Sequence, residues 1–405
     1  MVTTFPSSHK VDLSRIRLAI RSLQPQLVEW RRQLHQKPEL GFEEKITAEF
    51  IQNKLQEWGI EHETGIAETG IVAIIKGTKL GTEKVLAIRA DMDALPIQEQ
   101  NEVPYKSQHD GIMHACGHDG HTAIALGTAY YLQQHRDSFA GTVKMFFQPA
   151  EESPGGAKPM IEAGVLKKPD VDGIIGLHLW NNLPVGSVGI RSGALMAAVE
   201  CFDCTILGKG GHGAMPHQTV DSIVVGAQII NALQTIVARN VDPLESAVVT
   251  VGEFHAGTKR NVIADTARLS GTVRYFNPAY KGFFMERVEQ TIAGICQSQG
   301  ASYDFNYWSH YPPVINHPEM TELVRSQAQD VVETPMGIVP ECQTMGGEDM
   351  SFFLEEVPGC YFFLGSANPA EDLAYPHHHP RFDFDETALA MGVEIFVRCV
   401  EKFCN

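Results

Sequence analysis

The stretch GTVKMFFQPAEE occupies residues 141–152 and is the part of the sequence that best defines the fold. Its first eight residues form a nearly continuous apolar run, which is typical of a strand buried on both faces. The residues from Gln148 to Glu152 follow this run directly and include two acids. In open α/β sheets, ligands bind at the carboxyl ends of the strands. The stretch therefore predicts an α/β sheet with a polar site at one edge.

The segments on either side of this strand favour the same architecture. Further strands are predicted at residues 72–75, 85–89, 173–178 and 361–364. Helices are predicted at residues 13–35, 47–58 (with Thr47 as the N-cap), 119–135 and at the C-terminus. Alternating strands and helices indicate an α/β layer architecture with a largely parallel sheet.

The pattern changes near Gly193. Three segments alternate apolar and polar residues, as half-buried antiparallel strands do, and two longer helices separate them. The strands are predicted at 199–207, 247–254 and 267–275, and the helices at 221–239 and 278–299. These five elements fit a βαββαβ order, which predicts a ferredoxin-like α+β domain. The sequence thus predicts a discontinuous α/β domain (residues 1–192 and 313–405) interrupted by an inserted α+β domain (residues 193–312).

Composition excludes several classes of protein. The 405 residues carry a formal net charge of −17, which repels phosphate backbones and argues against a nucleic-acid partner. No segment approaches the ~20 apolar residues that cross a bilayer, so no membrane partner is expected. Met1–Lys10 is polar and resembles no secretory signal, which predicts a cytoplasmic location. The eight cysteines are too scattered for a disulfide scaffold.

Five polar clusters, predicted near the ends of strands, carry the chemistry of the sequence. They are RADMD (89–93), HACGHDGH (114–121), QPAEE (148–152), His178 and HHH (377–379). Thiolate, imidazole and carboxylate groups together are the ligand set of borderline transition metals. Of two adjacent glutamates, one can hold a metal while the other serves as base for a water molecule. The excess of ligands predicts two metal ions in one site.

Taken singly, these residues have ordinary explanations. A lone Cys116 would most often be a small buried apolar side chain, and Glu151 alone would usually be a solvated acid. The coincidence of five clusters favours a metal site over these explanations. Cys201 and Cys204 form a CxxC pattern, but they lie within a predicted strand and have no partner pair, so we interpret them as structural.

Seven segments resemble the M20 family of metallopeptidases, in particular its N-acyl-amino-acid amidohydrolases, which include hippurate hydrolases and plant indole-acetyl-amino-acid hydrolases. They are RQLHQKPELGFEE (within 31–44), RADMDALP (89–96), MHACGHDGHTA (113–123), QPAEE (148–152), GLHLW (176–180), GKGGHGAMP (208–216) and RNVIAD (260–265). The resemblance extends from about residue 26 to the C-terminus. It implies a metal-dependent catalytic α/β domain and an inserted lid or dimerisation domain.

The resemblance also implies a set of metal ligands and a general base. The implied ligands are Cys116, His118, Glu152, His178 and His378, with His377 and His379 as alternatives to His378. Glu151 would be the general base. The acid pair Glu348-Asp349 matches a further family block, as residues that support the ligands.

One motif departs from the wider superfamily. Asp93 corresponds to the site-supporting aspartate at the third position of an HxDxxP pattern. Asp91 stands at the histidine position of that pattern, which implies that Cys116 and His118 replace the usual ligands.

The inserted domain contributes three further implied residues. His212 matches a lid histidine that polarises the scissile carbonyl. It would have to reach the metal site by domain closure or from a second subunit. Asn261 and Arg274 match groups that hold the carboxylate of the substrate, although spacing alone would make Arg274 an ordinary surface arginine.

The implied reaction is hydrolysis of an N-acyl-L-amino acid, with an N-acetyl, N-benzoyl or indole-acetyl group, to a carboxylate and a free amino acid. Two divalent metal ions, Mn²⁺ or Zn²⁺ with Ni²⁺ or Co²⁺ as alternatives, would activate a water whose proton Glu151 takes. A homodimer through the lid domain is expected. The alternatives are a dipeptidase or aminopeptidase of the same family, a non-catalytic metal-dependent binding protein, and a thiol-redox protein that uses Cys201 and Cys204.

Overall fold

A computed structural model describes residues 13–332 and 336–405, which divide into two compact units. The first unit contains the chain up to Arg191, His317–Cys342 and Val357–Asn405, and the second contains Ser192–Asn316 and Gln343–Glu356. The predicted domains differ from these units mainly at Gln343–Glu356, which we had placed in the first. The roles of catalytic domain and lid stay predictions. Met1–Lys10, where we predict no secretory signal, lies outside the described residues.

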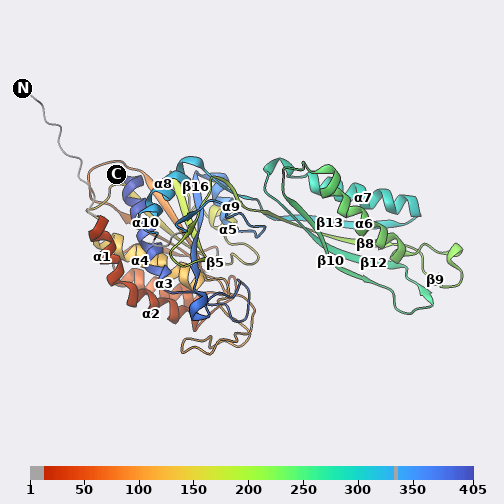
Figure 1. The fold of residues 1–405 in the computed structure, drawn as a ribbon, viewed down its shortest axis with the longest axis horizontal. Helices are drawn as coiled ribbons and strands as arrows, with labels where there is room; N and C mark the ends of the chain where they lie inside the picture. The colour runs from red at the N-terminus through yellow and green to blue at the C-terminus, as the bar shows by residue number, and fades with distance from the viewer. Residues whose placement is uncertain (1–12, 333–335) are drawn as a thin grey trace, which may run out of the picture. The chain divides into compact units, whose positions relative to one another are not determined.

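The first unit alternates strands and helices, as expected (Figure 1). Its elements are α1 (Leu13–Ser22), α2 (Gln24–His35), α3 (Lys45–Glu57), β1 (Glu61–Ile66), β2 (Gly70–Lys76), β3 (Val85–Asp91), α4 (His118–Gln134), β4 (Thr142–Gln148), α5 (Ala157–Glu162), β5 (Gly173–Pro184), β6 (Val188–Gly189), α8 (Pro318–Gln329), β15 (Ile338–Val339), β16 (Gly359–Ala367) and α10 (Ala388–Cys404).

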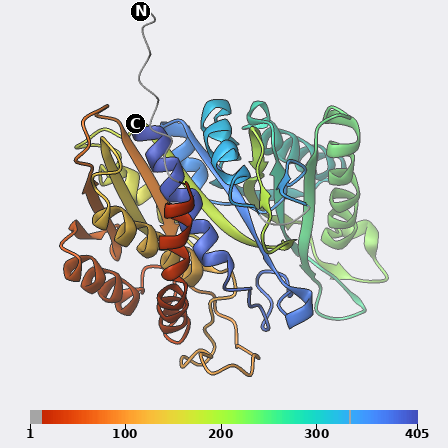
Figure 2. The same cartoon turned by 60° about the vertical axis from the view of Figure 1, so that its left-hand side comes forward.

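Among the described residues, the strands of this unit form one eight-stranded mixed sheet in the order β1-β2-β4-β3-β5-β16-β6-β15. The central strands β4, β3, β5 and β16 run parallel, so their carboxyl ends meet at one edge. β3 and β16 are buried along their whole length, because helices such as α4 and α10 pack against the sheet (Figures 1 and 2). Burial on both faces explains the unbroken apolar runs in the sequence.

The second unit has the predicted βαββαβ order. Its elements are β7 (Gly193–Met196), β8 (Ala198–Leu207), β9 (Gly211–His212), α6 (Ser222–Asn240), β10 (Ala247–Ala256), β11 (Val262–Ile263), β12 (Thr266–Tyr275), α7 (Phe283–Gln299), β13 (Ser302–Tyr311), β14 (Val314–Asn316) and α9 (Met350–Glu356). The four long strands form an antiparallel sheet in the order β10-β12-β8-β13. Residues of α6 and α7 pack into one core with this sheet, which is the ferredoxin-like arrangement.

The structure corrects two predicted helices. The helix predicted at residues 13–35 is two helices, and Pro25 stands in the first turn of the second, where its missing N–H costs no hydrogen bond. Thr47 is not an N-cap, because α3 begins at Lys45. Instead, the Glu39 carboxylate accepts hydrogen bonds from the N–H groups of Ile46 and Thr47.

Helix α6 corrects a further expectation. Within residues 13–332 and 336–405, it is the one helix whose length and composition would allow it to span a membrane. The prediction that no segment approaches that length is therefore wrong for α6. Its Val225, Ile229 and Leu233 are buried in the core of the second unit, and packing accounts for their apolar character.

Candidate active site

The predicted metal ligands all lie in the first unit and gather near one edge of its sheet. Cys116 and His118 flank Gly117, the N-cap of α4, whose φ of 91° requires a residue without a Cβ. Glu151 and Glu152 lie just beyond β4, which ends at Gln148. His178 lies within β5 and not at its end, since β5 continues to Pro184.

The carboxylate of Asp93 fixes the two glutamates from behind. Its Oδ1 accepts the backbone N–H of Glu151 at 2.9 Å, and its Oδ2 accepts that of Glu152 at 3.0 Å. The backbone carbonyl of Asp93 accepts a hydrogen bond from Nδ1 of His118 at 2.9 Å. Asp93 thus holds the β4 end and the start of α4 in register.

Two groups of possible ligands share Cys116. The first contains Cys116, His118 and His178, and the second contains Cys116, Glu152 and His378. Within each group, the ligand atoms lie within 4.8 Å of one another. Two overlapping groups around one sulfur are the arrangement that two neighbouring metal ions need.

The donor atoms fit metal ions on a second observation. Nε2 of His118 is buried and has no hydrogen-bond partner in the structure, although buried polar atoms almost always have one. Burial opposes the charged imidazole, yet the carboxylates of Asp91 and Asp93 raise the pKa of His118 to about 10. This pocket of negative charge favours a cation beside His118.

The surroundings of Cys116 and His178, in contrast, shift the pKa of each side chain toward its neutral form. Burial and the carboxylates of Glu152 and Glu151 raise the pKa of Cys116 well above its usual value. Burial lowers the pKa of His178, with His121 and His377 adding to the effect. A neutral imidazole is a metal ligand as it stands, whereas the thiol must lose its proton when a metal binds.

The three histidines at 377–379 have three different environments. His378, at a φ of 64°, places Nε2 at 3.0 Å from Oε1 of Glu152. His377 is hydrogen-bonded to the carbonyl of Leu179 and stacks on Trp180. His379 stacks on Tyr375. Of the three, His378 is the one that the structure brings into a ligand group.

A model of peptidase family M20/M25/M40 matches residues 87–402. The chain belongs to the M20 peptidase family. It is 46% identical over 305 residues to the N-acyl-L-amino acid amidohydrolase of Geobacillus stearothermophilus, covering 75% of this chain and 81% of that one. It is 38% identical over 400 residues to thermostable carboxypeptidase 2 of Saccharolobus solfataricus, covering 97% and 99%.

A solved structure of the M20 family gives the same picture. YxeP of Bacillus subtilis, described as a dinuclear metal-binding peptidase, is similar with a TM-score of 0.82 and 37% identity, covering 95% of this chain and 99% of that one. The chain is therefore an enzyme of the M20 hydrolase family. Its two ligand groups and this dinuclear neighbour support two divalent metal ions.

The predicted substrate-binding residues of this M20 enzyme lie in the second unit, at opposite ends of its sheet. His212 and Asn261 are exposed neighbours, since His212 pairs with Val262. Strand β9 lies beyond the end of the four-stranded sheet (Figure 1), and Asn261 precedes β11, which is followed directly by β12. Arg274 lies near the other end of β12, eight residues from Thr266, or about 26 Å along the strand.

The surroundings of Arg274 include a histidine that the sequence did not point to. Arg274 donates to the carbonyl of Val273, and within the described residues no acid forms an ion pair with it. Burial, and then the charge of Arg274, lower the pKa of His310 on β13. Nε1 of Trp308 donates to Nε2 of His310 at 2.9 Å, which leaves the His310 proton on Nδ1.

A buried ionic network behind α4 was also missed. Asp119, the residue after His118, accepts hydrogen bonds from Nε of Arg31 and Nδ1 of His35, both at 2.7 Å. Nε2 of His35 in turn lies 3.3 Å from the Glu99 carboxylate. Arg31 and His35 belong to the stretch RQLHQKPELGFEE. Their acidic partners are 64 or more residues away in the sequence, so the sequence does not reveal the network.

The acid pair Glu348-Asp349 and the cysteines Cys201 and Cys204 belong to the second unit. Glu348 and Asp349 are buried, and Glu348 caps the start of α9 in the second unit. Cys201 and Cys204 lie three residues apart on β8, so their side chains point to opposite faces of the sheet. This geometry disfavours a thiol-redox pair.

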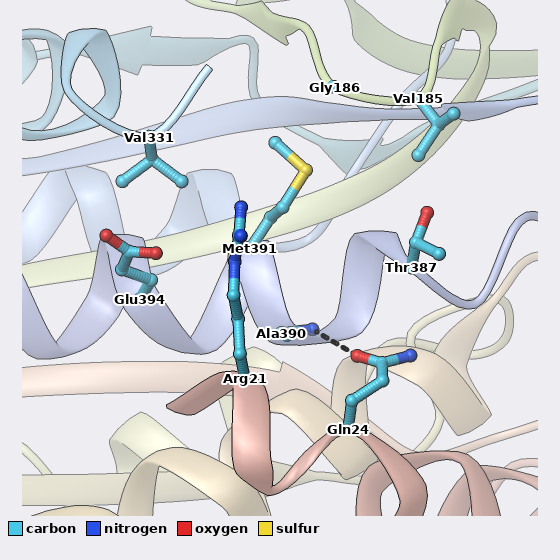
Figure 3. A pocket seen from close by; sticks show the side chains of 9 residues that line it. All are labelled: Arg21, Gln24, Val185, Gly186, Val331, Thr387, Ala390, Met391 and Glu394. Atoms are coloured by element: carbon cyan, nitrogen blue, oxygen red, sulfur yellow. Dashed lines mark hydrogen bonds between the residues drawn. The ribbon is translucent and has the colours of Figure 1, made fainter. Parts of the chain in front are cut away.

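A cavity of about 520 Å³ lies elsewhere in the first unit (Figure 3). Its lining includes Arg21 and Gln24 together with Thr387, Met391 and Glu394 of the α10 region. None of the predicted ligands lines it, so it is separate from the metal site.

Proposed function

We propose that the chain hydrolyses the amide bond of N-acyl-L-amino acids, releasing a carboxylate and a free amino acid, at a centre of two divalent metal ions. The observation that carries this proposal is the pair of ligand groups that share Cys116, next to the buried carboxylate of Glu151. The names of the relatives support the substrate class. Mn²⁺ and Zn²⁺ are the metals that we expect, with Ni²⁺ or Co²⁺ as alternatives, and a cytoplasmic location stays a prediction.

Bound in the two groups, the metals would polarise the amide carbonyl and acidify a water molecule. Glu151 is the proposed base: its carboxylate takes the proton of the attacking water and then delivers it to the leaving nitrogen. Its neighbour Glu152 lies 3.0 Å from Nε2 of His378 and would hold a metal ion together with it. The Asp93 carboxylate keeps both glutamates in place through their backbone N–H groups, and it also lies 3.4 Å from Nδ1 of His118.

Arg274 is the proposed anchor for the carboxylate of the substrate. Its guanidinium is half-buried and lacks an acidic partner among the described residues, and burial lowers its pKa. Such a guanidinium gains most from a carboxylate, which it can bind through two parallel hydrogen bonds. The −17 charge of the chain makes a local cation necessary for an anionic substrate.

His212 and Asn261 are proposed to act from a second copy of the chain. They lie beyond the Thr266 end of β12, which is about 26 Å from Arg274 along the strand, whereas an N-acyl amino acid spans only a few bonds. One copy of the second unit therefore cannot place all three residues on one substrate. Helix α6 suits a subunit interface, because its first turn exposes the apolar residues Ile223 and Val224 and Arg239 is its only charged residue.

Peptides are the alternative substrates. The relative named carboxypeptidase favours them, since a peptide with a free carboxyl end presents the same carboxylate to Arg274. A dipeptidase or aminopeptidase would in addition need an acid for the free amine.

The test combines metal analysis with a substrate panel. Purified protein should contain about two equivalents of transition metal, and a metal-loaded sample should release amino acids from N-acetyl, N-benzoyl or indole-acetyl conjugates. The same amino acids offered in dipeptides are the comparison. Metal-loaded protein that cleaves only dipeptides would overturn the substrate assignment, and protein that binds no metal would overturn the mechanism.

A further inference from the structure

The backbone of Leu179, the residue after His178, contacts three histidines. Its N–H donates to Nε2 of His121 at 2.8 Å. Its carbonyl lies 2.6 Å from Nδ1 of His178 and 2.9 Å from Nε2 of His377. The N–H and the carbonyl of one residue therefore link one predicted metal ligand to two histidines that ligate nothing in the proposed site.

His121 is itself fixed on its other side. Its Nδ1 lies 2.6 Å from Oδ1 of Asp91, and Oδ2 of Asp91 accepts a hydrogen bond from Nη1 of Arg89 at 2.7 Å. Arg89 also donates from Nε to Gln148 at the end of β4. The side chains in this chain of hydrogen bonds are almost completely buried: the exposed fraction is 1% for Arg89, 0% for Asp91 and 2% for His121. Water therefore cannot reach them, and they depend on one another for hydrogen bonds.

These contacts determine the proton positions. His121 must accept the N–H of Leu179 at Nε2, so its own proton is on Nδ1 and points to Asp91. His178 donates from Nδ1 to the Leu179 carbonyl, which leaves the lone pair of Nε2 for a metal. Nε2 of His178 lies 3.4 Å from Sγ of Cys116, on the side of the first ligand group.

The same contacts argue against a different metal site. Asp91, His118 and His121 also lie close enough to hold an ion. However, both nitrogens of His121 already have partners, and Asp91 is paired with the buried guanidinium of Arg89. A cation there would face a fixed positive charge and would find no free imidazole lone pair on His121.

We propose that Asp91 and His121 are positioning residues, which orient the proposed metal ligand His178 through the backbone of Leu179. This proposal rests on the proposed metal centre. Asp91 stands where the wider superfamily has a ligating histidine, and in this chain it acts one step away from the metal. Residues that orient ligating histidines contribute about 10- to 100-fold to metal affinity.

The test uses two substitutions of His121. His121→Phe keeps an aromatic ring but removes both hydrogen bonds. His121→Gln keeps a donor for Asp91 and an acceptor for the Leu179 N–H at a similar spacing, and serves as the rescue. His135→Phe is the control, because His135 ends the same helix α4 and contacts only Tyr131 and its neighbourhood.

The readout is stepwise binding of Mn²⁺ to metal-free protein, measured by calorimetry, with far-UV circular dichroism to verify folding. We expect His121→Phe to weaken one of the two binding steps about 10- to 100-fold and to leave the other within about threefold. His121→Gln and His135→Phe should bind both ions as the wild type does.

The outcomes separate this proposal from the proposed function. Unchanged binding of both ions by folded His121→Phe would overturn the positioning role alone. If His121→Phe does not fold, the result for His121→Gln decides the question. A folded His121→Gln protein in which one of the two Mn²⁺ binding steps is weakened would also overturn the positioning role. A wild type that binds no Mn²⁺ and no Zn²⁺ would overturn the metal centre itself.

Discussion

Glu151 and Glu152 are neighbours in sequence, but their surroundings assign them different tasks. Glu151 is 6% exposed and belongs to no group that contains Cys116, whereas Oε1 of Glu152 lies 3.0 Å from Nε2 of His378. Glu151→Gln should keep both metal ions but lower kcat by about 100- to 10,000-fold, because the amide cannot take a proton.

Glu152→Gln is the matched control, because it should lose metal as well as activity. The measurements are kcat on the best substrate of the panel and metal content by mass spectrometry. Near-normal turnover of Glu151→Gln, or loss of its metal, would contradict the assignment.

Arg274 is the residue that should distinguish substrates. Arg274→Ala removes the proposed carboxylate anchor, so KM should rise about 10- to 100-fold, in keeping with ~1.5–3 kcal/mol for a hydrogen bond to a charged group. N-acyl amino acid amides, which lack the carboxylate, should be affected much less. Arg268→Ala, a change of an exposed arginine on the same strand, should leave KM unaltered. Equal losses for acid and amide substrates would refute the anchor.

At the scale of elements, the turn that leads into α4 places two proposed ligands, Cys116 and His118, on either side of Gly117. Gly117 has a φ of 91°, where a side chain costs on the order of 1–3 kcal/mol. Gly117→Ala should therefore relax the turn, displace Cys116 or His118, and weaken Mn²⁺ binding at least tenfold, because the relief of strain moves the ligands.

The control for this prediction is Gly59→Ala. Gly59 follows α3 with a φ of 65° and has open space around it, so the substitution should cost about 1 kcal/mol of stability without changing metal affinity. Urea unfolding of metal-free protein and calorimetric titration measure the two effects. Similar metal affinities for the two variants would show that the turn does not control the ligands.

The contact between α2 and α4 should give the protein a pH-dependent stability. Burial and Arg31 oppose a charge on His35, but Asp119 and Glu99 outweigh them and raise the pKa of His35 from 6.5 to about 9. A raised pKa in the folded state stabilises the protein below pH 6.5, and this contribution is lost as the pH rises through about 9.

His35→Gln should therefore be less stable than the wild type, and the difference in the free energy of unfolding should be largest near pH 6. This difference should become smaller as the pH rises to 10. Urea titrations across this range measure it. His255→Gln, at an exposed site of the second unit, should show no such dependence. A gap that widens with pH would contradict the charged state of His35.

Much of the architecture could be predicted at this scale because buried strands have unmistakable sequences. GTVKMFFQ at 141–148 is β4 within one residue, and the alternation of apolar and polar residues located β8, β10 and β12. Strand β1 was missed because its residues are mostly exposed. It is held by pairing with β2, which no periodicity within β1 reveals.

The site was predictable only where one segment carries the signal. HACGHDGH and QPAEE each bring two of the proposed ligands or base residues together within a few positions. The role of His121 depends on the peptide N–H of Leu179, 58 residues away, and that of Asp91 on a buried arginine. A hydrogen bond from a backbone N–H has no signature in the sequence, so this network can be recognised only in the structure.

At the scale of the whole molecule, the proposed division of labour between copies can be tested by mixing inactive subunits. If His212 serves the partner's metal centre, a mixed dimer of Glu151→Gln and His212→Ala contains one intact site, formed by the Glu151 of one copy and the His212 of the other. Co-expressed subunits should then recover about one quarter of wild-type activity, since about half of the dimers are mixed.

Each variant alone should stay inactive, and this is the control for the mixture. Activity that stays at the level of the single variants, in dimers shown to be mixed by two affinity tags, would place both residues in one copy. A monomeric protein with full activity would refute the dimer as well.

The proposed ligands come from positions 116, 118, 152, 178 and 378, with the whole of the second unit encoded between the last two. A growing chain on the ribosome therefore has all five only after it has made the complete second unit. Since a site that requires the fold cannot hold its metal beforehand, we expect both metal ions to bind after that point of synthesis. The order of the chain thus makes metal loading a late event, and the ion that binds depends on which metals are available to the folded protein.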